Sequence, residues 1–248
     1  MEKIAVKLAG IPLEICCRYP ANVAFFKEYV TTEAPRFRLE VGEEDMALAT
    51  EQLSRQAQLD GTSDSPYPPR FVENCAIHWI LANEFAIRGV LLMHGSAIVM
   101  EGECYIFTAP SGTGKSTHTR LWRQQFGDRV YMLNDDKPML AVGEQGVTAY
   151  GTPWNGKHRL SRNASAPLKA IVQLERDTVN HIEPLPSIRA LPALHTQALR
   201  PYTAAAMEQV LRLERQILKT VPFYYMGCNM DPEAALVAYE GIRKGADQ

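Results

Sequence analysis

The sequence predicts an α/β protein with a small N-terminal α/β subdomain over residues 1–65 and a larger domain over residues 66–248. Three observations support this prediction. Short apolar runs alternate with helix-periodic segments, residues 60–69 are rich in Gly, Ser, Asp and Pro, and the 248 residues correspond to between one and two domains of about 150 residues each. A chain of this length buries a core without needing disulfides.

Composition and charge exclude several classes of protein. The 26 basic and 28 acidic side chains leave a net charge of −2, so we expect no broad basic surface and no nucleic-acid partner. The five cysteines are odd in number and lack metal-ligand spacing, which indicates a reducing cytoplasm. The most apolar stretch, residues 75–93, is interrupted by charged side chains, and the N-terminus lacks a signal-peptide pattern. We therefore expect a cytoplasmic protein that does not bind a membrane.

Alternation and helical spacing predict the elements of the N-terminal subdomain. Ile4, Val6 and Leu8 alternate with polar or small residues, as do the apolar residues of the run 37–41, and both patterns are typical of strands. The subdomain is therefore predicted to contain strands over 4–8 and 37–41, a helix from Pro20 to about residue 30, and a polar helix over 43–58.

The larger domain is predicted from the same signals. A turn at 101–103 joins two apolar runs into a hairpin, and Pro232 in a first turn favours the last helix. We expect, in order, a helix over 70–86, strands over 90–99 and 104–108, a helix over 115–126, a strand over 130–133, a hairpin of 139–142 with 147–150, a strand over 168–174, a helix over 203–218, a strand over 221–226 and a helix over 231–244.

The clearest motif is APSGTGKST at residues 109–117, which fits GxxxxGK[ST] except that Ala109 replaces the first glycine. Its glycines let backbone N–H groups turn toward phosphate oxygens, and the helix that follows adds the positive end of its dipole. A chance glycine turn would not also have a strand before it and a helix after it. We predict that Lys115 contacts the outer phosphates and that the nucleotide is held by Ser111, Gly112, Thr113, Gly114, Lys115, Ser116 and Thr117.

An acidic pair follows the next strand, at Asn134-Asp135-Asp136. Nucleotide hydrolases and kinases place a Mg²⁺-holding carboxylate at such a strand end, and a second carboxylate there can take a proton from an attacking hydroxyl. The same three residues are also common in solvated turns. Because the phosphate motif precedes them, we predict that Asp135 and Asp136 join the Ser116 hydroxyl as metal ligands or that one acts as a base.

These motifs together resemble the phosphoenolpyruvate carboxykinase/HPr kinase superfamily. The resemblance lies in MHG at 93–95, PSGTGKST at 110–117 and NDD at 134–136, with a hairpin before the phosphate loop, and it covers about residues 90–140. It implies a mixed sheet with a P-loop, ATP and Mg²⁺ as cofactors, and a hydroxyl-bearing acceptor. It also implies Asp136 as the base, His94 beside it as a tuning residue, and assembly into a homo-oligomer. Without the resemblance, His94 would be read as a core residue.

The segment GTPWNGKHR at 151–159 departs from that family. HPr kinases carry a metal-binding glutamate in the corresponding signature, and this segment has no acidic residue. Its basic side chains, Arg159 above all, would neutralise charge in a transition state, with Trp154 stacking on a ligand. A surface turn anchored by a buried Trp154 has the same composition, and both interpretations stay open.

Two functional hypotheses follow. The first is an ATP-dependent kinase that transfers the γ-phosphoryl group to a serine- or threonine-type hydroxyl of a protein, peptide or small molecule. The alternative is a non-catalytic module that senses ATP, which the missing acidic residue favours. A carboxykinase-like lyase is a weaker third hypothesis, because 248 residues leave little room for its further substrate residues.

Overall fold

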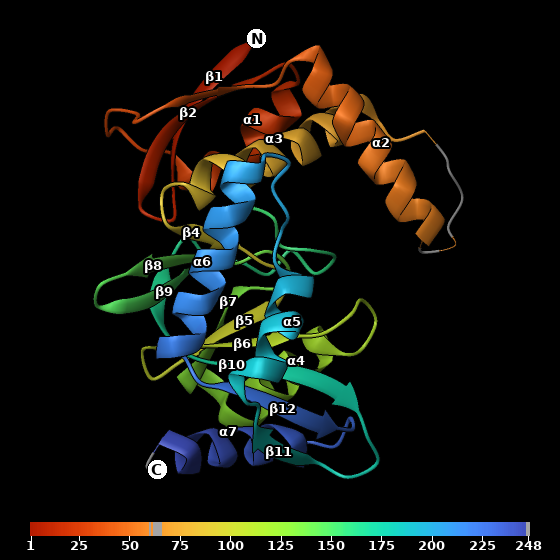
Figure 1. Cartoon of the computed structure of the whole chain (residues 1–248), viewed down its shortest axis with the longest axis vertical. Coiled ribbons are helices and arrows are strands. Elements are labelled where there is room, and N and C mark those ends of the chain that lie inside the picture. The colour runs from red at the N-terminus through yellow and green to blue at the C-terminus, as the bar shows by residue number, and fades with distance from the viewer. Residues whose placement is uncertain (60, 62–65, 247–248) are drawn as a thin grey trace.

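The N-terminal residues form a three-stranded sheet of their own (Figure 1). The computed structural model describes residues 1–59, 61 and 66–246. Strands β1 (Glu2–Leu8) and β2 (Ile11–Cys17) form an antiparallel hairpin, and β3 (Arg38–Glu40) pairs parallel to β2. The predicted strands at 4–8 and 37–41 correspond to β1 and β3. Strand β2 was not predicted because nearly all its side chains are buried, which removes the alternation of polar and apolar residues.

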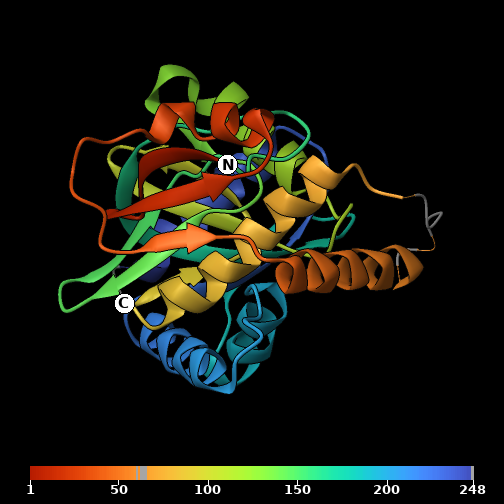
Figure 2. The ribbon, with the colours of Figure 1, turned by 90° about the horizontal axis from the view of Figure 1, so that it is seen from above.

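Helices complete this N-terminal unit. They are α1 (Pro20–Phe25), the 3₁₀ turn η1 (Lys27–Tyr29), α2 (Glu43–Leu59) and α3 (Pro69–Ala86). Viewed from above, α2 extends outward from the rest of the molecule (Figure 2). One apolar cluster joins Leu13 and Phe26 to Leu81 of α3 and Met139 further on, so its packing crosses the predicted boundary. The boundary at Ser65 itself lies outside the described residues, and the division into domains stays a prediction.

The larger part of the chain is built around a mixed sheet. Its strands are β4 (Val90–Leu92), β5 (Ser96–Met100), β6 (Glu103–Thr108), β7 (Val130–Asn134), β8 (Met139–Gly143), β9 (Gly146–Tyr150), β10 (Ser165–Arg176), β11 (His181–Pro184) and β12 (Phe223–Cys228). Within the described residues they run in the order β4-β8-β9-β10-β6-β5-β7, and β12 pairs with both β10 and β11. Both predicted hairpins are confirmed as β5–β6 and β8–β9.

The predicted single strand over 90–99 is wrong, because the chain changes partners at residues 93–95. Strand β4 pairs with β8, whereas β5 pairs with β6 and β7. Gly95 lies at this break, where a Cβ would be 2.9 Å from Ile106 Cγ2 and 3.2 Å from the Phe107 carbonyl oxygen. The close approach to β6 therefore requires a residue without a side chain.

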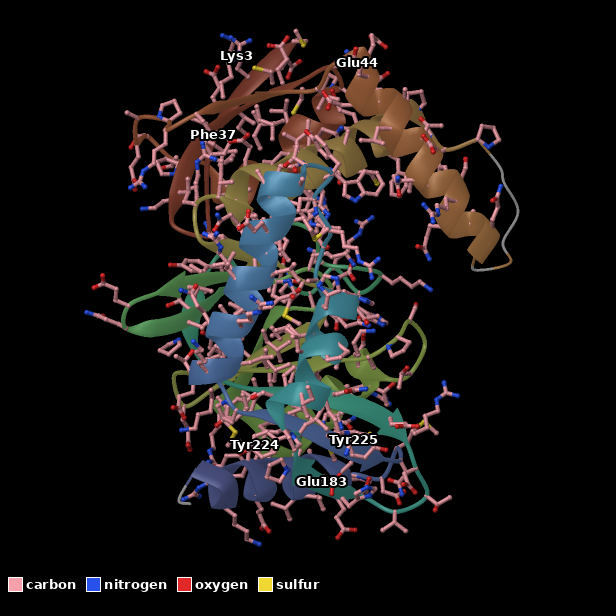
Figure 3. All side chains as sticks on the ribbon, in the orientation of Figure 1. Lys3, Phe37, Glu44, Glu183, Tyr224 and Tyr225 are labelled. Atoms are coloured by element: carbon pink, nitrogen blue, oxygen red, sulfur yellow. The ribbon has the colours of Figure 1, made fainter. Side chains whose placement is uncertain are left out.

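Helices cover both faces of the sheet. Alternate residues of β5 and β6 enter two separate clusters: one contains α5 (Ser187–Gln197) and α6 (Ala204–Thr220), the other α4 (Lys115–Phe126) and α7 (Glu233–Ala246). Tyr224 and Tyr225 of β12, both labelled in Figure 3, also belong to different clusters: Tyr224 packs with α4 and α7, and Tyr225 packs against the cluster of α5 and α6. Among the described helices, none has the length and apolar character needed to cross a bilayer.

The strand directions bring distant segments to one edge of the sheet. Strand β5 lies between β6 and β7 and is antiparallel to both, so β6 and β7 run the same way. Strand β10 is parallel to β6. The carboxyl ends of β6, β7 and β10 and the beginning of β5 therefore share one edge, the position where α/β sheets commonly bind ligands.

Candidate functional site

A glycine-rich loop (residues 109–114) connects the end of β6 to the beginning of α4. Gly112 has φ +80° and Gly114 has φ +128°, values that side-chain-bearing residues rarely adopt. A Cβ at either position would meet no atom within 4 Å, so the requirement for glycine is conformational and not steric. The predicted strand, loop and helix are all present, and the free N–H groups of the helix's first turn lie at the end of the loop.

Lys115, the first residue of α4, is buried and folds back over this loop. Its Nζ donates hydrogen bonds to the carbonyl oxygens of Ala109 at 2.9 Å and Pro110 at 3.3 Å. Burial lowers the pKa of Lys115, the charge on Lys137 lowers it further, and the neighbouring aspartates act in the opposite direction. Two backbone oxygens thus hold the ammonium group over the loop.

Arg176 holds the same loop from the neighbouring strand, and sequence reasoning missed it. It ends β10, where its Nη2 donates to the Gly112 carbonyl oxygen at 2.6 Å and its Nε to that of Thr113 at 3.4 Å. The predicted strand stopped at residue 174. A basic residue just beyond a strand is a weak signal, because only the parallel pairing of β10 with β6 places it beside the loop.

Asp135 follows β7 and is buried. Ser96 at the beginning of β5 donates a hydrogen bond to Asp135 Oδ1 at 2.6 Å. The Ser96 hydroxyl also lies 3.1 Å from Thr119 Oγ1, and Thr119 donates to the Ser116 carbonyl oxygen. A chain of hydroxyl groups therefore connects Asp135 to the first turn of α4, where Ser116 lies.

The donors at this edge fit Mg²⁺ bound together with phosphates. Mg²⁺ uses hard oxygen ligands and commonly takes one or two carboxylates while substrate phosphates and water fill its other positions. The Ser116 hydroxyl and the second oxygen of Asp135 are such donors. Among the described residues, no group of three or more His, Cys, Asp or Glu side chains would hold a metal by itself.

Asn134 shapes the turn that carries both carboxylates. Its Oδ1 accepts hydrogen bonds from the backbone N–H groups of Asp136 at 2.9 Å and Lys137 at 2.6 Å, and its Nδ2 donates to Thr152. This is the turn chemistry that the Asn-Asp-Asp sequence also indicates. The two interpretations of this motif are compatible, because the Asn134 side chain makes these turn hydrogen bonds and the two carboxylates do not.

His94 lies beside Asp136. The Asp136 carboxylate is 3.5 Å from His94 Nε2 and 2.9 Å from Lys137 Nζ, while His94 Nδ1 lies 3.1 Å from Gln197 Oε1. Burial lowers the pKa of His94 to about 4, helped by the charges of Lys137 and Lys115. The ring is therefore neutral near pH 7, and Lys137 is the ion-pair partner of Asp136. Sequence reasoning missed both Lys137 and Gln197. The position of Lys137 directly after Asn134-Asp135-Asp136 was a signal that could have found it.

The segment 151–159 contains both features that its sequence left open. Trp154 is buried, and its Nε1 donates to Asn74 Oδ1 of α3 at 2.9 Å. The side chains of Lys157 and Arg159 are exposed, together with that of the residue between them. Gly156 packs against Asp136, since a Cβ on it would lie 3.2 Å from Asp136 Cβ. The tryptophan is thus an anchor, and the exposed basic end of the segment follows the glycine that packs against Asp136.

The nucleotide-binding residues expected from the sequence all lie on this edge. The glycine-rich loop, Lys115 and Ser116 are at the end of β6, and Asp135 and Asp136 are at the end of β7. Hydrogen bonds and close contacts connect them to His94 and to the segment 151–159 as described above. Their roles in binding and catalysis stay predictions.

No protein-family model matches the chain, and no curated protein matches it at a significant level. Among solved structures, it is similar to the Hpr(Ser) kinase/phosphatase from Coxiella burnetii, with 9% sequence identity and a TM-score of 0.35. The match covers 62% of this chain and 90% of that chain. Similarity at this level assigns neither a family nor an activity, so a function has to be inferred from the geometry of the site.

Proposed function

We propose that this chain is an ATP-dependent kinase that transfers the γ-phosphoryl group to a serine- or threonine-type hydroxyl of a protein, peptide or small molecule. The observation that carries the proposal is the meeting of the glycine-rich loop, Lys115 and the two carboxylates at one sheet edge. Phosphoryl transfer depends mainly on positioning and on neutralising charge. A loop that fits phosphate, next to a metal-binding carboxylate and a second carboxylate, supplies both.

Each part of the edge has a separate role in the proposal. The loop amides and Lys115 bind the outer phosphates, leaving the loop carbonyls that Lys115 now contacts. Ser116 and Asp135 hold Mg²⁺, which neutralises charge on the phosphates when it is bound. Arg176 keeps the loop in position through its two backbone contacts.

Asp136 acts on the acceptor in this proposal. The acceptor oxygen bonds to the γ-phosphorus while the bond from that phosphorus to the β–γ bridging oxygen breaks, and ADP leaves with the electron pair. The hydroxyl proton goes to the Asp136 carboxylate. Lys137 and the neutral ring of His94, both in contact with that carboxylate, fix its position.

Transfer of label from γ-³²P-ATP with Mg²⁺ tests the proposal. Wild type, Asp136→Asn and the control Asp128→Asn are compared against HPr, free serine and threonine, serine-containing peptides and small hydroxyl compounds. Asp128 is an exposed residue of the turn after α4, so its variant tests loss of one surface charge. We expect label on one acceptor class, lost in Asp136→Asn and kept in Asp128→Asn, with ATP binding unchanged in all three.

A nucleotide-sensing module is the second candidate. It is favoured by the absence of a carboxylate in the segment 151–159 and by the ion pair that already occupies Asp136. This function predicts tight Mg-ATP binding with no labelled product from any acceptor. It also predicts that Asp136→Asn leaves every measurable property of the nucleotide complex unchanged.

A further inference from the structure

A cavity of about 1000 Å³ opens beside Asp136. Three segments line it: residues 21–29 of α1 and η1, the first turns of α3, and residues 153–161. None of residues 109–117, all of which are described, belongs to its lining. The cavity is therefore separate from the phosphate-binding loop, and it shares Asp136 and Arg159 with the proposed active site.

A buried carboxylate fixes the wall of the cavity that α1 and α3 form. Glu73 of α3 is fully buried and accepts hydrogen bonds from the backbone N–H groups of Arg18 at 2.6 Å and Tyr19 at 3.3 Å, and from Asn22 Nδ2 at 2.7 Å. Asn22 Nδ2 also lies 2.9 Å from the Arg70 carbonyl oxygen. Charge-assisted bonds of this kind are stronger than neutral ones. They hold the start of α1 on α3.

Aromatic packing fixes the second wall. Trp154 bonds to Asn74 of α3, and its ring contacts Phe25 at 5.6 Å and Phe26 at 5.5 Å between centroids. On its other side it lies against His78, whose ring centroid is 4.6 Å away. These contacts cross-connect the segment 153–161, α1 and α3. The walls of the cavity are therefore fixed by contacts within the protein, as is usual in ligand sites.

The charge of the lining is positive. Lys27, Arg70, Lys157 and Arg159 face the cavity, against the carboxylates of Glu28 and Asp136. In the part of the chain that the structure describes, none of these four cations has an ion-pair partner, whereas Arg88, for instance, pairs with Glu84. Since the whole chain has a net charge of −2, this concentration of unpaired cations is local.

We infer that this cavity binds the phosphoryl acceptor, and that the acceptor is a small molecule carrying an anionic group, a carboxylate or a phosphate, besides the hydroxyl that meets Asp136. The inference rests on the proposed kinase function. Pockets for small molecules usually measure about 300–1000 Å³, so the volume is sufficient for a small molecule. Unpaired cations on fixed walls supply recognition of an anion, and Phe25 and Phe71 supply apolar contact.

Small hydroxyl compounds that differ in charge test the inference. Glycerate and glycerol 3-phosphate are compared with neutral glycerol, and with serine-containing peptides, in the label-transfer assay. We expect transfer to one of the anionic compounds, which separates the carboxylate from the phosphate, and little transfer to glycerol. Higher salt should raise the KM for the anionic acceptor, because salt screens its attraction to the lining cations. The KM for a neutral acceptor should not change.

Variants of two cations in the lining, Lys27 and Arg70, separate the effect of charge from an effect on folding. Lys27→Gln and Arg70→Gln should each raise the KM for the anionic acceptor by about fivefold, the effect of one exposed ion pair, with the KM for ATP unchanged. Arg189→Gln, an exposed arginine of α5, is the matched control and should change neither constant. Equal transfer to glycerol and to the anions, labelling of peptides alone, or variants of Lys27 and Arg70 that match the control would each overturn the inference.

A binding measurement keeps the two proposals apart. Titration calorimetry with glycerol 3-phosphate and with glycerate, in saturating Mg-ADP to fill the phosphate loop, needs no catalysis. If wild type shows a heat of binding that the double variant of Lys27 and Arg70 lacks, and no acceptor is labelled, the anion site is retained and the kinase is refuted. Transfer with normal rates in that double variant retains the kinase and refutes the anion site.

Discussion

The hydrogen bond from Ser96 to Asp135 gives a quantitative prediction. Ser96 is fully buried and its hydroxyl lies 2.6 Å from Asp135 Oδ1, so Ser96→Ala removes the donor from a buried carboxylate oxygen. A hydrogen bond to a charged group contributes about 1.5–3 kcal/mol. For a chain of this size each kcal/mol corresponds to about 2–4 °C, so we expect the melting temperature to fall by about 3–12 °C.

The assay is a double-mutant cycle of Ser96→Ala and Asp135→Asn, followed by circular dichroism and fluorescence in denaturant. The two residues are in contact, so the two losses of unfolding free energy should not add, and the coupling should reach about 1 kcal/mol or more. Thr119→Val is the control, because it removes the other partner of Ser96 and leaves the bond to Asp135 in place. It should cost about 1 kcal/mol, the contribution of a neutral hydrogen bond.

Either of two results would refute this reasoning. One is a Ser96→Ala protein whose melting temperature lies within about 1 °C of that of wild type, well below the predicted fall. The other is strict additivity in the cycle, which would show that Asp135 is oriented independently of Ser96. Mg-ATP provides a third readout. If Asp135 helps to hold the metal, adding Mg-ATP should raise the melting temperature of Ser96→Ala by less than it raises that of wild type.

Four further predictions concern single residues. Arg159→Ala should lower turnover by roughly 10³-fold with little change in ATP affinity, if it neutralises transition-state charge; equal effects on both constants, measured by steady-state kinetics and ATP titration, would contradict this. Arg176→Gln should raise the Kd for ATP, measured by calorimetry, because the loop loses two contacts; an unchanged Kd counts against that role. The unfolding free energy should decline as pH falls from about 6.5 to about 4, because His94 binds a proton in the unfolded chain but stays neutral in the folded protein, where burial lowers its pKa. His94→Gln should flatten this pH dependence in denaturant titrations, and the same pH dependence in wild type and variant would contradict the prediction. Gly95→Ala should cost about 1–3 kcal/mol in the same titrations through its clash with β6, whereas Gly143→Ala, with no atom closer than 3.8 Å, should cost less; equal costs would rule out the clash.

The features that sequence reasoning predicted are those with local signals. The strand, glycine-rich loop and helix around Lys115 follow from turn chemistry and hydrophobic spacing within about twenty residues. The same holds for the carboxylates that follow β7, because a short apolar run next to Asn-Asp-Asp is visible in the sequence. Helices α6 and α7 were predicted because their apolar residues repeat at helical spacing.

The features that were missed depend on contacts between distant segments. Strand β2 has no alternation, and α5 contains Pro192, which argues against a helix from sequence alone. Arg176 reaches the glycine-rich loop only through the pairing of β10 with β6, and Gln197 reaches His94 from the end of α5. The change of partners at 93–95 is invisible as well, because β4 and β5 are both apolar and buried.

The cavity bears on the choice between kinase and sensor. A nucleotide sensor needs the glycine-rich loop and the proposed metal ligands, but it gives no reason for a second, cation-lined cavity that meets the proposed nucleotide site at Asp136. Gly156 is packed against that aspartate and Asn134 shapes its turn, so the carboxylate is fixed between the two proposed binding surfaces, which are built from different parts of the chain. A proton acceptor for a bound hydroxyl belongs at such a boundary. The N-terminal unit, which supplies α1 and η1 to the cavity wall, then acts in acceptor binding, and its presence beside this edge favours the kinase.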